Sequence, residues 1–141
     1  MERGERAAFL GVERSLTGRR WAARLAEVEE TYIALVAAIV RFQRVVICVS
    51  DDDVETYAEM RLRSNRVDMD RVRFVTVPYD DTWLRDSGPI TLRDGTGFRL
   101  LDFRFTGWGG KFDASDDDRL VERLHAQHEF RDSTRDTIDF A

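Results

Sequence analysis

The chain has 141 residues, 43% of them hydrophobic, which is enough for one domain with a real core. Its 22 basic and 27 acidic side chains give a net charge of -5, which argues against a nucleic-acid partner and favours cationic ligands. No apolar run reaches the roughly 20 residues of a membrane span, and no signal peptide precedes the first expected helix. We therefore expect a cytoplasmic protein without membrane contact.

The N-terminal third begins with a charged stretch and continues with two regular elements. Residues 1–18 show no strand pattern, so we expect a divergent or disordered segment there. From Arg19 to Phe42, apolar residues recur every three or four positions, which predicts a long amphipathic helix. Residues 44–50 form an apolar run that predicts a buried strand. Cys48 lies in this run and is the single cysteine of the chain, so we expect a buried core residue rather than a nucleophile, in a reducing compartment.

The remaining elements alternate between helix and strand, which indicates an α/β fold with a mixed sheet. Two acidic triplets, Asp51–Asp53 and Asp116–Asp118, predict helix starts, because carboxylates cap and stabilise the first turn. Glycines between residues 94 and 97 predict a hairpin turn. The expected elements are a helix over residues 54–63, strands over 71–77, 90–93 and 98–105, and a helix over 115–128 before a last strand.

Both histidines of the chain fall on the last expected helix. His125 and His128 are three residues apart and could share a face for a metal ion. No cysteine and no third acid at ligand spacing completes such a site. We therefore expect two surface histidines and no metal.

The segment from Pro78 to Pro89, PYDDTWLRDSGP, directly follows the expected strand over residues 71–77. Ligands of open α/β sheets bind at the carboxyl ends of strands. Trp83 offers a flat apolar face, and the acids around it offer acceptors for a planar cationic group rich in donors, which fits a guanidinium. A structural interpretation stays open, in which Asp80 and Asp81 end a strand and residues 87–89 form an ordinary turn.

Two motifs, DDTWLRDSGP at residues 80–89 and FTGWGGKF at residues 105–112, resemble the agmatine deiminase family, which includes bacterial peptidylarginine deiminases. The resemblance covers residues 20–141. It implies a pentein (α/β propeller) fold and a hydrolase of linear amidines, which converts a guanidinium to a ureido group and ammonia, as in putrescine and polyamine synthesis. By this resemblance Asp86 grips the guanidinium, and the other pocket residues are Trp83, Arg85, Asp81, Trp108 and Lys111.

The departures from the family pattern lead to a further expectation. Family members carry a cysteine nucleophile near the C-terminus, and a histidine and a second acid in a middle segment, whereas this chain ends at Ala141 before any of these. We expect residues 19–141 to be the amino-terminal part of a truncated pentein domain, about two of its modules. The resemblance implies a cationic guanidino substrate, agmatine or an arginine derivative, and no cofactor. An incomplete propeller leaves an unpaired face, which predicts self-association.

Two other functions stay open. One is a binding or vestigial module that recognises a guanidinium ligand or a partner's arginine without turnover. The other is a phosphotransfer enzyme in which Asp80 or Asp81 acts as the nucleophile with Mg²⁺, although these acids are adjacent rather than alternating.

Overall fold

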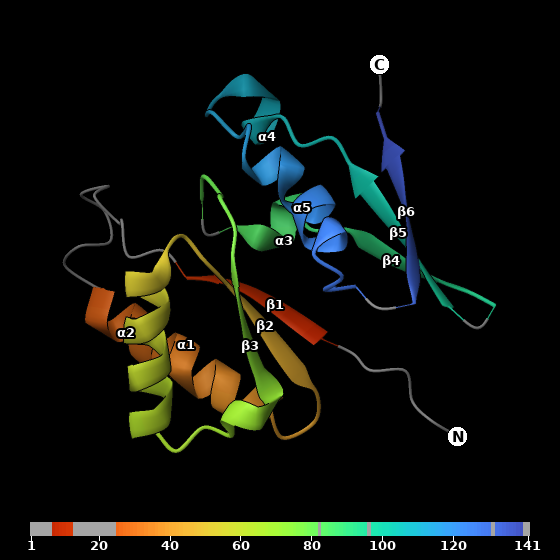
Figure 1. Cartoon of the computed structure of the whole chain (residues 1–141). Helices are drawn as coiled ribbons and strands as arrows, with labels where there is room; N and C mark the ends of the chain where they lie inside the picture. Colours follow the sequence, from red (N-terminus) through yellow and green to blue (C-terminus); the bar gives the residue numbers. More distant parts are fainter. Residues whose placement is uncertain (1–6, 13–24, 82, 96, 131, 140–141) are drawn as a thin grey trace. The chain divides into compact units, whose positions relative to one another are not determined.

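A computed structural model describes residues 7–12, 25–81, 83–95, 97–130 and 132–139 (Figure 1). The chain divides into two compact units, Met1–Thr76 and Val77–Ala141. The elements in chain order are β1 (Ala7–Val12), α1 (Leu25–Ile39), β2 (Arg44–Val49), α2 (Asp52–Ser64), η2 (Met69–Arg71), β3 (Val72–Thr76), α3 (Leu84–Ser87), β4 (Ile90–Asp94), β5 (Gly97–Phe103), α4 (Gly107–Gly110), η3 (Asp117–Arg119), α5 (Leu120–Ala126) and β6 (Ser133–Ile138).

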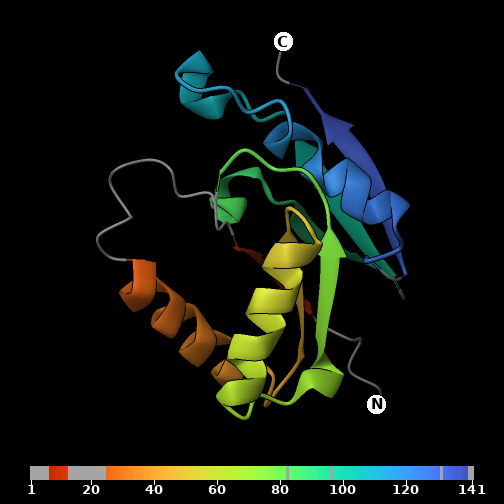
Figure 2. The same ribbon diagram turned by 60° about the vertical axis from the view of Figure 1, so that its left-hand side comes forward.

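The first unit is a parallel sheet in the order β1-β2-β3 with two helices on one face (Figure 2). The central strand β2 is buried along Val45–Val49, as expected of a strand inside a parallel sheet. Its side chains at 45, 47 and 49 join one hydrophobic cluster with residues of α1 and α2. Cys48 lies in this strand with no exposed surface, which confirms the prediction of a buried core cysteine.

The strand β1 corrects the expectation for the N-terminal segment. Ala7–Val12 pairs in parallel with Arg44–Val49, so the part of residues 1–18 that the structure describes contains a strand. The run AAFLGV is short and lies between charged residues, which dominated the composition of the segment. Pairing with β2 satisfies the backbone groups of this run, and that stabilisation does not appear in the local sequence.

The helices of the first unit match the predicted ones in place but differ at their ends. Residues 19–24 of the first predicted helix lie outside the described residues, and α1 ends at Ile39, where the amide of Phe42 donates to the Ile39 carbonyl in a turn. The Asp51 side chain accepts from the Val54 amide at 2.9 Å, which confirms the predicted N-cap of α2. Tyr57 of α2 donates to Glu29 of α1 at 2.9 Å and so ties the helices together.

The second unit is a mixed sheet in the order β4-β5-β6. The β4–β5 pair is the predicted antiparallel hairpin, whereas β6 runs parallel to β5. A parallel neighbour requires a long crossover connection, and residues 104–132 supply it. This crossover carries the second motif and α5, which buries Leu120, Val121 and Leu124 on its inward face.

One ion pair is buried against the second sheet. The Nε of Arg135 on β6 lies 2.6 Å from the carboxylate of Asp102 on β5, and Asp102 is 3% exposed. Burial raises the pKa of Asp102, while the bond from Arg135 opposes this shift. The arginine therefore offsets part of the cost of burying this carboxylate, and the effect of burial remains the larger one.

Candidate functional site

The first motif consists of a connection and a short helix. The helix α3 spans Leu84–Ser87, and the Asp86 amide donates to the Trp83 carbonyl at 2.8 Å. Gly88 directly follows this helix, and a Cβ there would lie 2.8 Å from the Leu84 carbonyl oxygen. The glycine therefore allows the chain to pass close to α3.

The side chains of α3 divide into an outward group and one buried hydroxyl. Trp83 is 52% exposed, and Arg85 and Asp86 are also exposed. Neither charged group has an ion pair with any residue that the structure describes. The hydroxyl of Ser87 is buried and has no hydrogen-bond partner among the residues that the structure describes. Trp83 and the helix that follows it thus present an indole, a guanidinium and a carboxylate to solvent.

The second motif is a tight turn built on left-handed backbone. Gly107 has a φ of 61°, and a Cβ on it would lie only 2.2 Å from the Phe112 carbonyl oxygen. Trp108 has a φ of 58°, a left-handed conformation that is strained for a bulky residue. The turn is closed by the Gly110 amide, which donates to the Thr106 carbonyl at 2.7 Å.

Aromatic rings surround the exposed indole of Trp108. Its ring meets the edge of Phe105 at a centroid distance of 5.2 Å and that of Phe112 at 5.8 Å. The Nζ of Lys111 lies 5.3 Å from the Phe112 centroid. These contacts hold Trp108 within its own motif, and its ring makes no contact with the Trp83 ring among the described residues.

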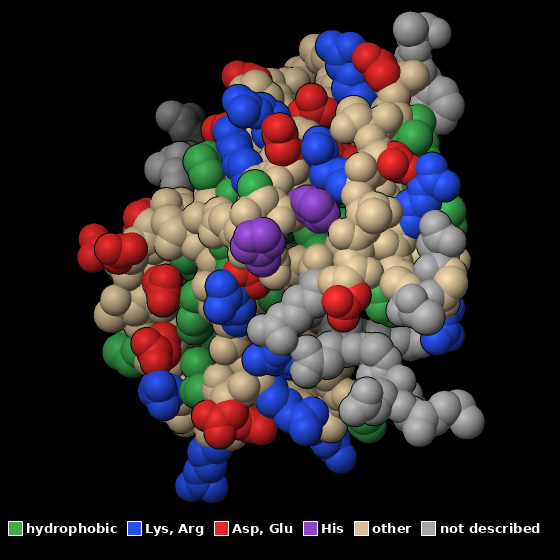
Figure 3. All heavy atoms as spheres, turned by 45° about the vertical axis from the view of Figure 1, so that its right-hand side comes forward, with side chains coloured by type: hydrophobic (Ala, Val, Ile, Leu, Met, Phe, Trp, Pro, Cys, Tyr) green, Lys and Arg blue, Asp and Glu red, His purple; other side chains and the backbone are tan. Residues whose placement is uncertain are grey.

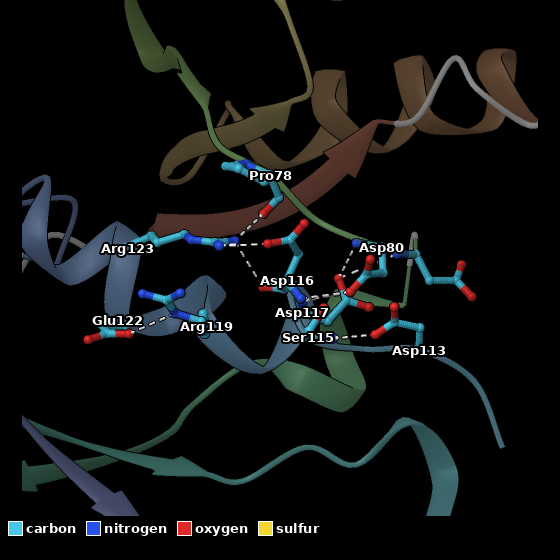
Figure 4. Close-up of polar contacts among 10 residues, drawn as sticks. Pro78, Asp80, Asp113, Ser115, Asp116, Asp117, Arg119, Glu122 and Arg123 are labelled. Carbon is cyan, nitrogen blue, oxygen red and sulfur yellow. Dashed lines mark hydrogen bonds and ion pairs between the residues drawn. The ribbon is translucent and has the colours of Figure 1, made fainter. Parts of the chain in front are cut away.

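Two aspartates join the first motif to the turn before α5 by a reciprocal set of bonds (Figure 4). The Asp80 carboxylate accepts from the amides of Asp116 at 2.7 Å and Asp117 at 3.3 Å. In return the Asp117 carboxylate accepts from the amides of Asp80 at 2.8 Å and Asp81 at 3.4 Å. Each carboxylate thus fixes the backbone of the other segment.

Arg123 of α5 completes this connection. It donates to the Pro78 carbonyl at 3.0 Å and to the Asp116 carboxylate at 2.6 Å (Figure 4). On the other side of the turn, the Asp118 carboxylate accepts from the Phe105 amide at 2.6 Å, where the second motif begins. Both motifs are therefore tied to neighbouring residues of η3.

This arrangement corrects the interpretation of the second acidic triplet. We expected Asp116–Asp118 to start a helix over residues 115–128, but η3 precedes a shorter α5 and Asp116 makes no side-chain cap. The carboxylates of Asp117 and Asp118 bind other segments instead. Asp80 likewise has the structural role that the sequence left open, and its engagement with backbone amides argues against a phosphotransfer nucleophile at this position.

Asp117 is the most buried member of the triplet, with 3% exposure. Burial raises its pKa, and the backbone bonds from Asp80 and Asp81 oppose the shift because they favour the charged form. No sequence pattern identified Asp117 and Arg123 as parts of the site. The only signal was the density of acids directly after the second motif.

The two histidines lie on one face of the second unit (Figure 3). They line an open cavity of about 500 Å³ together with Phe98, Phe130, Asp132 and neighbouring residues. His125 is half-buried and its Nε2 lies 3.3 Å from the Ser133 carbonyl, whereas His128 is exposed. Among the described residues, no group of three or more His, Cys, Asp or Glu side chains is placed to hold a metal.

The chain is similar in sequence and fold to several known proteins. The chain matches the agmatine deiminases of Stutzerimonas stutzeri, with 36% identity over 64% of this chain, and of Ectopseudomonas mendocina, with 36% identity over 58%. It spans 23% and 21% of the lengths of these two relatives. A solved agmatine deiminase from C. jejuni with substrate bound, a cysteine-to-serine variant, superimposes with a TM-score of 0.74 and 23% identity, over 96% of this chain and 37% of that one.

The two sheets and their helices are thus part of a pentein-type α/β fold, which confirms the predicted fold class. A family model of the Porphyromonas-type peptidyl-arginine deiminases matches residues 13–138. The chain belongs to this family, as its two motifs predicted. Within the described part of the chain, no helix has the length and apolar character needed to cross a membrane.

Proposed function

We propose that this chain forms one wall of the substrate pocket of a guanidino-group deiminase, with agmatine as the first candidate substrate. The observation that carries the proposal is the outward presentation of Trp83, Arg85 and Asp86 on α3, while the nearby Asp80 is engaged in backbone bonds. The relatives are named agmatine deiminases, which supports the choice of substrate class.

The chemistry assigns a role to each group. Asp86 accepts N–H bonds from the guanidinium and balances its charge, and Trp83 covers a planar face. Trp108 and Lys111 of the second motif, together with Arg85 and Asp81, line or support the same pocket. Hydrolysis needs a thiolate aimed at the guanidinium carbon and an acid that protonates the leaving ammonia. The one cysteine of the chain, Cys48, is fully buried and is therefore not placed to supply the thiolate.

We therefore expect this chain to bind a guanidino ligand without turning it over, in the cytoplasm and with self-association through open sheet edges. Titration of the 141-residue chain with agmatine, followed by amide resonances, tests the binding. Asp86→Asn removes the charge and keeps the shape, so we expect about 1.5–3 kcal/mol less binding free energy, or about 10- to 150-fold weaker affinity. Asp53→Asn, which changes an exposed acid of α2, is the matched control.

The results separate the proposed role from a structural one. Loss of affinity in Asp86→Asn with an unchanged melting temperature supports the anchor. Equal affinity in Asp86→Asn and Asp53→Asn would remove it. Comparing agmatine with an arginine-containing peptide then distinguishes a small-molecule pocket from a peptidyl-arginine pocket.

The burial of Cys48 also favours a second candidate, a guanidinium-binding module without catalysis. Both candidates predict binding, and they differ in ammonia release once a late cysteine and a histidine are supplied by a longer reading frame. Ammonia released from agmatine by the isolated chain, and abolished by Cys48→Ser, would contradict both.

A further inference from the structure

The acidic triplet before α5 connects three parts of the second unit, and each acid has a different task. Asp116 binds Arg123, Asp117 binds the amides of Asp80 and Asp81, and Asp118 binds the amide of Phe105. The partners of Asp117 lie 36 and 37 residues away along the chain, and the partner of Asp118 lies 13 residues away. Three consecutive residues therefore join two segments that are distant in sequence.

The bonds of Asp117 and Asp118 fix the path of the backbone, because their donors are main-chain amides. They place no requirement on the side chains of the residues that donate. In each motif the bound amides lie a few residues before the exposed indole, at Asp80 and Asp81 before Trp83 and at Phe105 before Trp108. The helix α3 also lies against η3, so the first motif meets this turn at both its ends.

We propose that Asp117 and Asp118 are positioning residues that set the separation of the two motif loops and thereby the width of the guanidinium pocket between them. This inference rests on the proposed function, because the width of the pocket matters only if both motifs contact one ligand. Asp117 controls the first loop and Asp118 the second. Arg123 holds the turn itself, through the Asp116 carboxylate and the Pro78 carbonyl.

A purely stabilising role for the triplet predicts a different behaviour. Loss of any stabilising bond lowers the melting temperature and affects both loops alike. A positioning role predicts loop-specific effects, because each carboxylate contacts only one loop. It also predicts rescue by asparagine at position 117, since the amide oxygen of Asn still accepts from a main-chain N–H.

The test uses the full 141-residue chain labelled with ¹⁵N, in which three tryptophan side chains give three indole N–H signals. Signals are assigned with single Trp→Phe variants. We expect Asp117→Ala to shift the indole signal of Trp83 and leave that of Trp108 in place. Asp118→Ala should produce the opposite pattern. Asp113→Ala is the matched control, because within the described part of the chain its carboxylate accepts only from the nearby Ser115 amide, at 3.1 Å.

Agmatine affinity is measured on the same variants. We expect about tenfold weaker binding for Asp117→Ala and for Asp118→Ala, from the loss of one or two backbone bonds each. Asp117→Asn should stay within about threefold of the unsubstituted chain, because the acceptor geometry survives. If Asp117→Ala fails to fold, Asp118→Ala and Asp80→Ala provide the same comparison, the latter acting on the first loop.

Two results would overturn the inference. One is an equal shift of both indole signals in Asp117→Ala and in Asp118→Ala. The other is unchanged agmatine affinity in both alanine variants of a chain that binds agmatine. Failure of the unsubstituted chain to bind agmatine counts against the proposed function instead, and the indole pattern then decides the positioning role alone.

Discussion

Replacing Gly107 with alanine tests the backbone geometry on which the second motif depends. Gly107 has a φ of 61°, and the added Cβ would lie 2.2 Å from the Phe112 carbonyl oxygen and 3.2 Å from the Ala114 Cβ. An alanine in the left-handed region costs about 1–2 kcal/mol. Relief of the overlap requires a backbone shift, which we expect to cost a further amount of about 1–3 kcal/mol. The free energy of unfolding should therefore fall by about 2–5 kcal/mol.

Gly109→Ala separates the two contributions. Gly109 also has a positive φ, of 80°, but a Cβ there meets no atom within 4 Å. This control should lose only the conformational cost of about 1–2 kcal/mol. Urea unfolding followed by circular dichroism gives both free energies. The Trp108 indole resonance, which should move in Gly107→Ala, shows whether the motif rearranges. Equal destabilisation of the two variants would refute the reasoning, because the close approach to Phe112 would then have no energetic effect.

Two further predictions concern buried carboxylates of the second unit. Arg135→Met leaves the Asp102 charge buried without its partner and should lower the free energy of unfolding at pH 7 by about 3–5 kcal/mol. Adding Asp102→Leu to this variant should restore most of the lost stability. No recovery in the double variant would contradict the pairing. Burial raises the pKa of Asp102 and Asp117 above the unfolded value of about 3.9, so these two groups bind more protons in the folded state than in the unfolded state. The contribution of the two groups to stability therefore falls as pH rises from about 4 through their folded pKa. Urea unfolding at a series of pH values should show this negative slope for the chain and a flatter profile for Asp102→Asn, and identical profiles would contradict it.

Elements with a strong local pattern could be predicted from the sequence. The apolar run around Cys48, the Asp51 cap and the hairpin at residues 94–97 each carry their own signal, and the structure confirms all three. The strand β1 was missed because its six residues lie among charged ones and depend on pairing with β2, a partner more than 30 residues away.

The site was predictable only where its residues lie in the two motifs. The two motifs predict Trp83, Asp86 and Trp108 as pocket residues, and a pocket shared by these three stays a prediction. The reciprocal bonds between Asp80 and Asp117 join positions 37 residues apart, and either acid taken alone is typical of a turn or a cap. Local patterns contain no information about such pairs, because the crossover between β5 and β6 brings them together.

The division of the strands between the two units has a consequence for the order of folding. Every strand of the β1-β2-β3 sheet comes from residues 7–76, and every strand of the β4-β5-β6 sheet comes from residues 90–138. Each of these strands pairs only with strands of its own sheet. During synthesis the first sheet can close before the ribosome has added the second motif, and the bonds of Asp117 and Asp118 form only after their own turn emerges. The two loops that carry the exposed tryptophans can then become ordered only after the first sheet has closed, together with the rest of the second unit.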